Sequence, residues 1–219
     1  MPAGLKGTIR RVVIALGVLV VVLAAILIIA QHTFPASTFE FQQHREFRGT
    51  LLTEPYPALS IRSQEPPWLL VGPGKHGVGD LRRWSGREVA LEGERIYRTS
   101  DRAEERMIEL IPGSLAAGES VPVQGSENLG DVQLTGEIVD SKCYFGVMNP
   151  GAGKVHRDCA VRCISGGIPP AFLVRDSSGN IVTLLLANWK RERLNHVGEP
   201  LTIRGRLSRS AGRLTLYQE

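Results

Sequence analysis

The chain has 219 residues and a formal net charge of +4, a length that fits one domain, or two small ones beside an anchor. Residues 1–30 supply +3 of this charge through Lys6, Arg10 and Arg11, with no acidic residue, so residues 31–219 carry only +1. Because proteins that bind the phosphate backbone usually need a dense positive face, this distribution argues against a nucleic-acid partner.

The first predicted element is a membrane anchor. Residues 12–30 are nineteen positions without a charge, mostly Val, Leu, Ile and Ala. A helix of this length spans about 28 Å, close to the hydrocarbon core of a bilayer. Because the basic residues precede it, the positive-inside rule predicts a single-pass protein of the cell inner membrane, with residues 1–11 in the cytoplasm and the C-terminal domains in the periplasm. A cleaved signal peptide is the alternative, although its apolar region is normally only about 7 to 15 residues long.

A weak internal repeat follows a short polar tether at residues 31–45. Three short segments of the first half resemble segments of the second half and occur in the same order, which predicts a duplicated unit. The matching pairs are 47–52 with 134–139, 66–71 with 169–174, and 86–93 with 198–205.

Both halves have the patterns of strands. In the second half, five apolar or alternating runs are interrupted by one helical stretch, Ala187–His196, between the third and fourth runs. This order is similar to that of an OB-fold, a small five-stranded Greek-key barrel, and the first half gives the same outline. The expected strands of the first half include Glu46–Leu52, Trp68–Val71, Glu88–Tyr97 and Arg106–Leu110. Those of the second half are Val132–Val139, Ala171–Val174, Ile181–Leu186, Leu201–Leu207 and Arg213–Tyr217.

The predicted fold is therefore all-β with short helices: one N-terminal transmembrane helix followed by two OB-like five-stranded barrels. The first barrel is expected at residues 46–112 and the second at residues 131–219. Residues 113–130, rich in Gly, Ser and Glu, are expected to be a linker between them.

All three cysteines lie in an apparent insertion into the second half. The distance from the glycine of the first strand to the first proline of the Pro-Pro pair is 17 residues in the first half and 33 in the second. The 16 extra residues hold the Cys/His segment. A loop added to a rigid barrel is a common location for function.

The spacing within this segment predicts a metal site. His156, Cys159 and Cys163 stand at i, i+3 and i+7 of a helix-compatible run, residues 154–165, so they share one helical face. Cys143, at the end of the first strand, can meet that face. The resulting Cys3His set suits tetrahedral zinc, with iron or copper as alternatives.

Two other interpretations of the cysteines stay open at this point. Outside the cytoplasm cysteines are usually paired, and a bridge from Cys143 to Cys159 or Cys163 would leave one thiol over. His156 would then be only a surface residue. The third interpretation is a redox-active thiol pair.

Residues 136–144, Gly-Glu-Ile-Val-Asp-Ser-Lys-Cys-Tyr, and residues 156–169 resemble a motif of little-characterised bacterial exported or membrane-anchored proteins. There the motif runs G-x-V-V-D-x-x-C-Y, then H-x-x-C-A-x-x-C-I-x-x-G-x-P, and all four Cys and His positions match. The resemblance covers residues 134–186 and implies an exported OB-like domain with a Cys/His cluster, without an established activity. A more distant likeness is to the membrane-anchored haem chaperone of cytochrome c maturation, but its C-terminal haem-binding histidine has no counterpart in residues 213–219.

No Ser/His/Asp order, paired carboxylates or cofactor fingerprint appears, so an enzyme is not the favoured prediction. The sequence predicts a membrane-anchored extracytoplasmic binding or accessory protein whose partners are the inner membrane and a membrane or electron-transfer complex. The alternatives are a disulfide-stabilised interaction or assembly subunit without metal, and a thiol redox protein.

Overall fold

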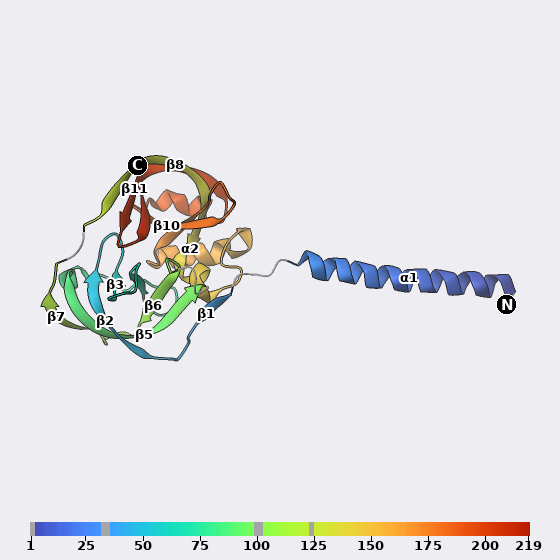
Figure 1. Ribbon diagram of the computed structural model, residues 1–219, viewed down its shortest axis with the longest axis horizontal. Helices are drawn as coiled ribbons and strands as arrows, with labels where there is room; N and C mark the ends of the chain where they lie inside the picture. Colours follow the sequence, from blue (N-terminus) through green and yellow to red (C-terminus); the bar gives the residue numbers. More distant parts are fainter. Residues whose placement is uncertain (1–2, 32–35, 99–102, 123–124) are drawn as a thin grey trace. The chain divides into compact units, whose positions relative to one another are not determined.

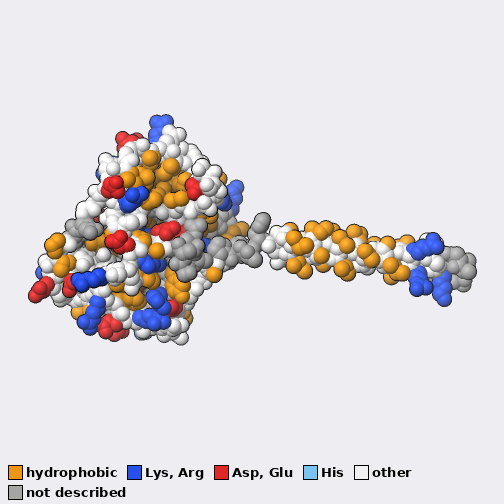
Figure 2. Space-filling view, viewed as in Figure 1, with side chains coloured by type: hydrophobic (Ala, Val, Ile, Leu, Met, Phe, Trp, Pro, Cys, Tyr) orange, Lys and Arg blue, Asp and Glu red, His pale blue; other side chains and the backbone are white. Residues whose placement is uncertain are grey.

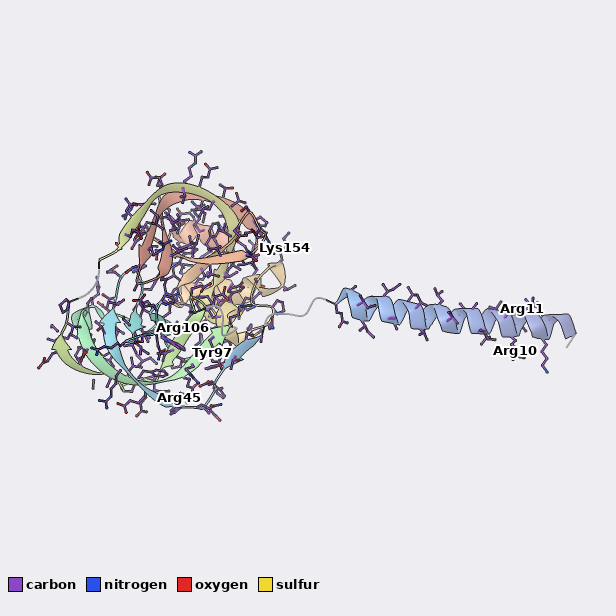
Figure 3. The ribbon with its side chains drawn as sticks, in the orientation of Figure 1. Arg10, Arg11, Arg45, Tyr97, Arg106 and Lys154 are labelled. Carbon is purple, nitrogen blue, oxygen red and sulfur yellow. The ribbon has the colours of Figure 1, made fainter. Side chains whose placement is uncertain are left out.

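The computed structural model describes residues 3–31, 36–98, 103–122 and 125–219 (Figure 1). The chain forms two compact units, Met1–Phe34 and Pro35–Glu219. The first contains α1 (Ala3–Ala30), a helix long and apolar enough to cross a membrane, although a signal sequence passes the same test. Apolar side chains cover its visible face, and basic side chains, among them Arg10 and Arg11, lie toward its N-terminal end (Figures 2 and 3).

The first barrel of the second unit is a ring of five strands. Its strands pair in the order β2-β3-β4-β6-β5, and the pairing of β5 with β2 closes the ring. Only β4 and β6 run parallel. The elements are β2 (Arg45–Leu52), β3 (Ala58–Ser60), β4 (Trp68–Val71), the 3-10 helix η1 (Arg82–Trp84), β5 (Arg87–Arg98) and β6 (Arg106–Leu110).

The second barrel repeats this topology. It is closed in the order β10-β12-β11-β8-β9, and only β10 and β12 run parallel. Numbered within each barrel, both halves have the strand order 1-2-3-5-4 with a parallel pair between strands 3 and 5, which confirms the prediction of two OB-like barrels. The elements are β8 (Glu127–Asp140), β9 (Pro170–Arg175), β10 (Ile181–Ala187), the 3-10 helix η4 (Arg191–His196), β11 (Pro200–Ser210) and β12 (Arg213–Gln218).

Two segments expected to be irregular contain strands. β1 (Ser37–Phe39) forms within the expected tether, and β7 (Ala116–Ser120) forms within the expected linker. The reason is β5, which is 12 residues long whereas β2 has 8. One edge of β5 pairs with β2 and β1, and the other pairs with β6 and β7, so the two short strands satisfy backbone groups that the ring leaves unpaired.

The expected helix at residues 187–196 is also shorter than predicted. β10 continues through Ala187, so only the 3-10 turn η4 remains between the third and fourth strands of the second barrel.

The two barrels share a buried core that includes the inserted segment. One cluster joins side chains of the first barrel, such as Val71 and Met107, to Val139 and Leu185 of the second. Hydrogen bonds also cross between the barrels: the buried Arg213 donates to the carbonyl of Pro67 at 2.6 Å, and Tyr56 donates to the carbonyl of Leu186 at 2.5 Å. The helix α2 (Arg157–Ser165) of the insertion lies between the barrels (Figure 1). The inserted side chains in this cluster are Cys143, Tyr144, Phe145, Cys163 and Ile168.

Candidate metal centre

Cys143 is positioned by the end of β8. The strand stops at Asp140, whose side chain is fully buried, and its Oδ1 accepts a hydrogen bond from the backbone N–H of Cys143 at 2.8 Å. The chain then turns through the π-helical segment η2 (Cys143–Val147). An aspartate that accepts the N–H three residues ahead satisfies a donor at the start of the turn, so it fixes the backbone of Cys143.

Cys159 and Cys163 lie on α2, as the spacing predicts. A 3-10 turn, η3 (Lys154–His156), precedes the helix, and Gly166 ends it by donating to the carbonyls of Arg162 and Cys163. Cys159 is half-buried and Cys163 is buried, so one face of the helix carries both thiols toward η2.

The three sulfurs surround one point. The Cys143 sulfur lies 4.0 Å from the Cys159 sulfur and 4.0 Å from the Cys163 sulfur, and all three atoms lie within 4.8 Å of one another. These separations are too long for a disulfide, which needs about 2.05 Å. They are close to the edge of a tetrahedron with zinc–sulfur bonds of about 2.3 Å, which is about 3.8 Å. The three cysteines could therefore hold a metal ion.

His156 belongs to a second group. Its Nε2 lies 3.1 Å from Oδ2 of Asp140, and these two side chains and Cys143 place their ligand atoms within 4.8 Å of one another. Sequence spacing grouped His156 with all three thiols. However, His156 has φ −102° and ψ −6° at the N-cap of α2, outside its regular turns, so the helical spacing does not direct its ring. The two groups share Cys143, and Asp140 joins the candidate ligands.

A lysine that the sequence did not point to also contacts the thiols. Lys75 of the first barrel places its Nζ 2.9 Å from the Cys159 sulfur. This hydrogen bond raises the pKa of Lys75. The two residues are 84 positions apart, so no local spacing could have found the pair. Residues 72–77 form the loop that carries this lysine.

That loop is fastened to the insertion at two places. The buried ammonium of Lys142 donates to the carbonyls of Gly72 at 2.8 Å and Gly74 at 2.7 Å, and it pairs with Glu109. The N–H of Gly77 donates to the carbonyl of Gly166 at 3.0 Å. The first barrel therefore contributes one wall of the cysteine site.

A hydrogen bond between two of the thiols shifts their pKa values in opposite directions. The hydrogen bond between Cys143 and Cys163 raises the pKa of Cys143 and lowers the pKa of Cys163. Burial and the nearby carboxylate of Asp140 raise the pKa of Cys143 further. Because thiolates are the metal-binding form, metal entry at this site would release protons, and binding would weaken in acid.

Comparison with known proteins gives no match: no protein-family model, no curated protein and no solved structure resembles this chain. The functional conclusion therefore depends on the site itself.

Proposed function

We propose that this chain is a membrane-anchored extracytoplasmic accessory protein that binds one zinc ion through Cys143, Cys159 and Cys163. The observation that carries the proposal is the placement of three sulfurs around one point, with two separations of 4.0 Å. His156 is the proposed fourth ligand. Its Nε2 faces Asp140 at 3.1 Å, and His156 groups with Cys143 but not with Cys159 and Cys163, so this role requires its ring to turn toward these sulfurs when zinc binds. Iron or copper fits the same soft donors less specifically.

The burial of the thiols supports a bound cation. Cys143 and Cys163 are only 4% and 1% exposed, and the carboxylate of Asp140 is fully buried beside them. Thiolates and a carboxylate collected in such a place repel one another, and burial of uncompensated charge is costly. A divalent ion removes this cost, whereas a disulfide would use two of the thiols and give Asp140 and His156 only structural roles.

The rest of the chain supports an accessory role at a membrane. Helix α1 begins with Lys6, Arg10 and Arg11, which favours a cytoplasmic N-terminus and barrels on the outer side of the inner membrane. The proposed partner is therefore a membrane or electron-transfer complex that the metal-bearing barrel serves or helps to assemble.

A thiol redox protein is the second candidate. It is favoured by one contact, the ammonium of Lys75 on the half-buried Cys159, because a neighbouring cation favours a reactive thiolate. In that case the three thiols would be reactive without metal.

Metal analysis of the full-length chain in detergent, combined with thiol counting, tests these proposals. We expect one zinc per chain, three thiols that are alkylated only after chelation, and loss of the metal in Cys143→Ser. His156→Ala should weaken zinc binding, whereas His196→Ala, at an exposed position of the second barrel, should bind zinc as the native chain does. One free thiol and no metal would refute the zinc site and support a disulfide. Three reactive thiols without metal would support the redox alternative.

A further inference from the structure

Solvent reaches the three-thiol site from one side. Cys143 and Cys163 are buried, and among the three sulfur-bearing residues only Cys159 is half-exposed. The ammonium of Lys75 rests on that sulfur at a distance of 2.9 Å. An incoming molecule that approaches the sulfurs through Cys159 therefore meets a positive charge first.

The backbone of Lys75 is held in place although its side chain is exposed. A Cβ added to Gly166 would lie 1.9 Å from the carbonyl oxygen of Lys75, so the loop packs directly on the end of α2. Lys142 holds Gly72 and Gly74 of the same loop by hydrogen bonds from its buried ammonium. The lysine is thus presented to Cys159 by a fixed loop of the other barrel.

The groups that act on the charge of Lys75 are the thiols of the site. The groups that raise its pKa are Cys159, through the hydrogen bond, and then the charges of Cys163, Cys159 and Cys143. Asp140, the buried carboxylate of the site, contacts Cys143 and His156. The mouth of the site therefore differs in charge from its interior.

We propose that Lys75 makes the mouth of this site selective for anionic incoming ligands, so that the metal is exchanged with a thiolate of a partner protein. The metal part of this inference rests on the proposed zinc site; the charge selectivity does not. In the exchange, the partner's thiolate forms a bond to the metal while the bond to Cys159 breaks. No electron is transferred, and the released Cys159 thiolate keeps the ammonium of Lys75 as its counterion.

Alkylation of Cys159 in the metal-free chain tests the charge selectivity. The ratio of its rates with iodoacetate, which is anionic, and iodoacetamide, which is neutral, is measured by mass spectrometry. Because both reagents attack the same thiolate, the ratio is independent of the ionised fraction. We expect the ratio to be about fivefold lower in Lys75→Gln than in the native chain, the effect of one charge at about 4 Å in water. Added salt should shrink this difference.

Two variants serve as controls. Lys75→Arg keeps the charge and should keep the native ratio. Lys154→Gln removes an exposed charge of the insertion (Figure 3), and no hydrogen bond or ion pair joins Lys154 to the sulfurs among the described residues, so it should also leave the ratio unchanged. Equal ratios in the native chain and in Lys75→Gln would overturn the inference.

A second measurement tests the exchange. Zinc loss to 3-mercaptopropionate, whose thiolate form carries two negative charges, is compared with loss to 2-mercaptoethanol, whose thiolate form carries one, at equal thiolate concentrations. The same fall in ratio is expected in Lys75→Gln. If the native chain binds no zinc, the proposed function and the exchange step both fail, while the alkylation ratio still decides the charge selectivity. If zinc binds and neither ratio changes, the zinc site stands and the role of Lys75 is refuted.

Discussion

Asp140 offers the most direct test of how the site is built. Its two carboxylate oxygens accept from different parts of the insertion: Oδ1 from the backbone of Cys143 at 2.8 Å, and Oδ2 from His156 at 3.1 Å. A hydrogen bond to a charged group contributes about 1.5–3 kcal/mol, and a buried donor left alone costs a similar amount. Asp140→Ala removes both acceptors, so we expect it to lower the free energy of unfolding by about 3–5 kcal/mol. Asp140→Asn keeps an oxygen for the Cys143 N–H and loses only the charge, so we expect a loss of about 1–2 kcal/mol.

The assay is urea unfolding of the metal-free, full-length chain in detergent, followed by tryptophan fluorescence. Trp68, Trp84 and Trp189 all lie in the two barrels, so the signal reports their unfolding and not that of α1. Asp131→Asn is the matched control, an exposed aspartate of the same strand, expected to change stability by less than about 0.5 kcal/mol. If Asp140→Ala and Asp140→Asn lowered the free energy of unfolding equally, the two hydrogen bonds would not make the separate contributions that the geometry predicts.

Two more perturbations test β1 and the contact between the barrels. Glu40, directly after β1, accepts a hydrogen bond from Arg95, and this bond lowers the pKa of Glu40. The ionised carboxylate therefore stabilises the folded chain above the unfolded pKa of about 4.3. This stabilisation is lost as the pH falls through the lower pKa of the folded state. Glu40→Gln should therefore lower the free energy of unfolding by about 1–2 kcal/mol at pH 7. In urea titrations, this difference in unfolding free energy from the native chain should disappear below about pH 4. An equal difference at pH 3 and pH 7 would contradict the argument. Gly166→Ala should displace Lys75, lower stability by about 1–3 kcal/mol and lower the iodoacetate-to-iodoacetamide rate ratio at Cys159, as Lys75→Gln does. Gly125→Ala, where nothing lies within 4 Å of the added Cβ, is the control, and matching unfolding curves for the two variants would exclude the close contact.

Local patterns predicted most of this fold. The five strands expected in the second half all lie within β8 to β12, because alternation and turn residues specify half-buried strands locally. The helix of the insertion was also predictable, since Gly153 and Gly166 stand at its two ends. Two of the three matched pairs fall on equivalent strands, β2 with β8 and β5 with β11. The third match was wrong, because residues 66–71 belong to β4, the third strand of the first barrel, and residues 169–174 belong to β9, the second strand of the second barrel.

Contacts between distant segments could not be predicted in this way. β1 and β7 have only 3 and 5 residues, and they form because β5 offers unpaired edges, which no property of the short segments reveals. The contact of Lys75 with Cys159 depends on the packing of one barrel against the other. His156 was assigned by helical spacing to the three thiols, but at the N-cap the backbone departs from that spacing, and Asp140 holds its ring.

The site is a property of the pair of barrels. Residues 141–169, between β8 and β9, are too few to bury a core of their own, and Cys143, Phe145 and Cys163 are covered where they join a cluster with Val71 and Met107 of the first barrel. If the second barrel stood alone, these side chains would be exposed, and the sulfurs would lose the packing that holds them 4.0 Å apart. The loop that carries the lysine would be missing as well. The pair of barrels therefore supplies what one barrel cannot: one barrel bears the thiols, and the other closes the site around them.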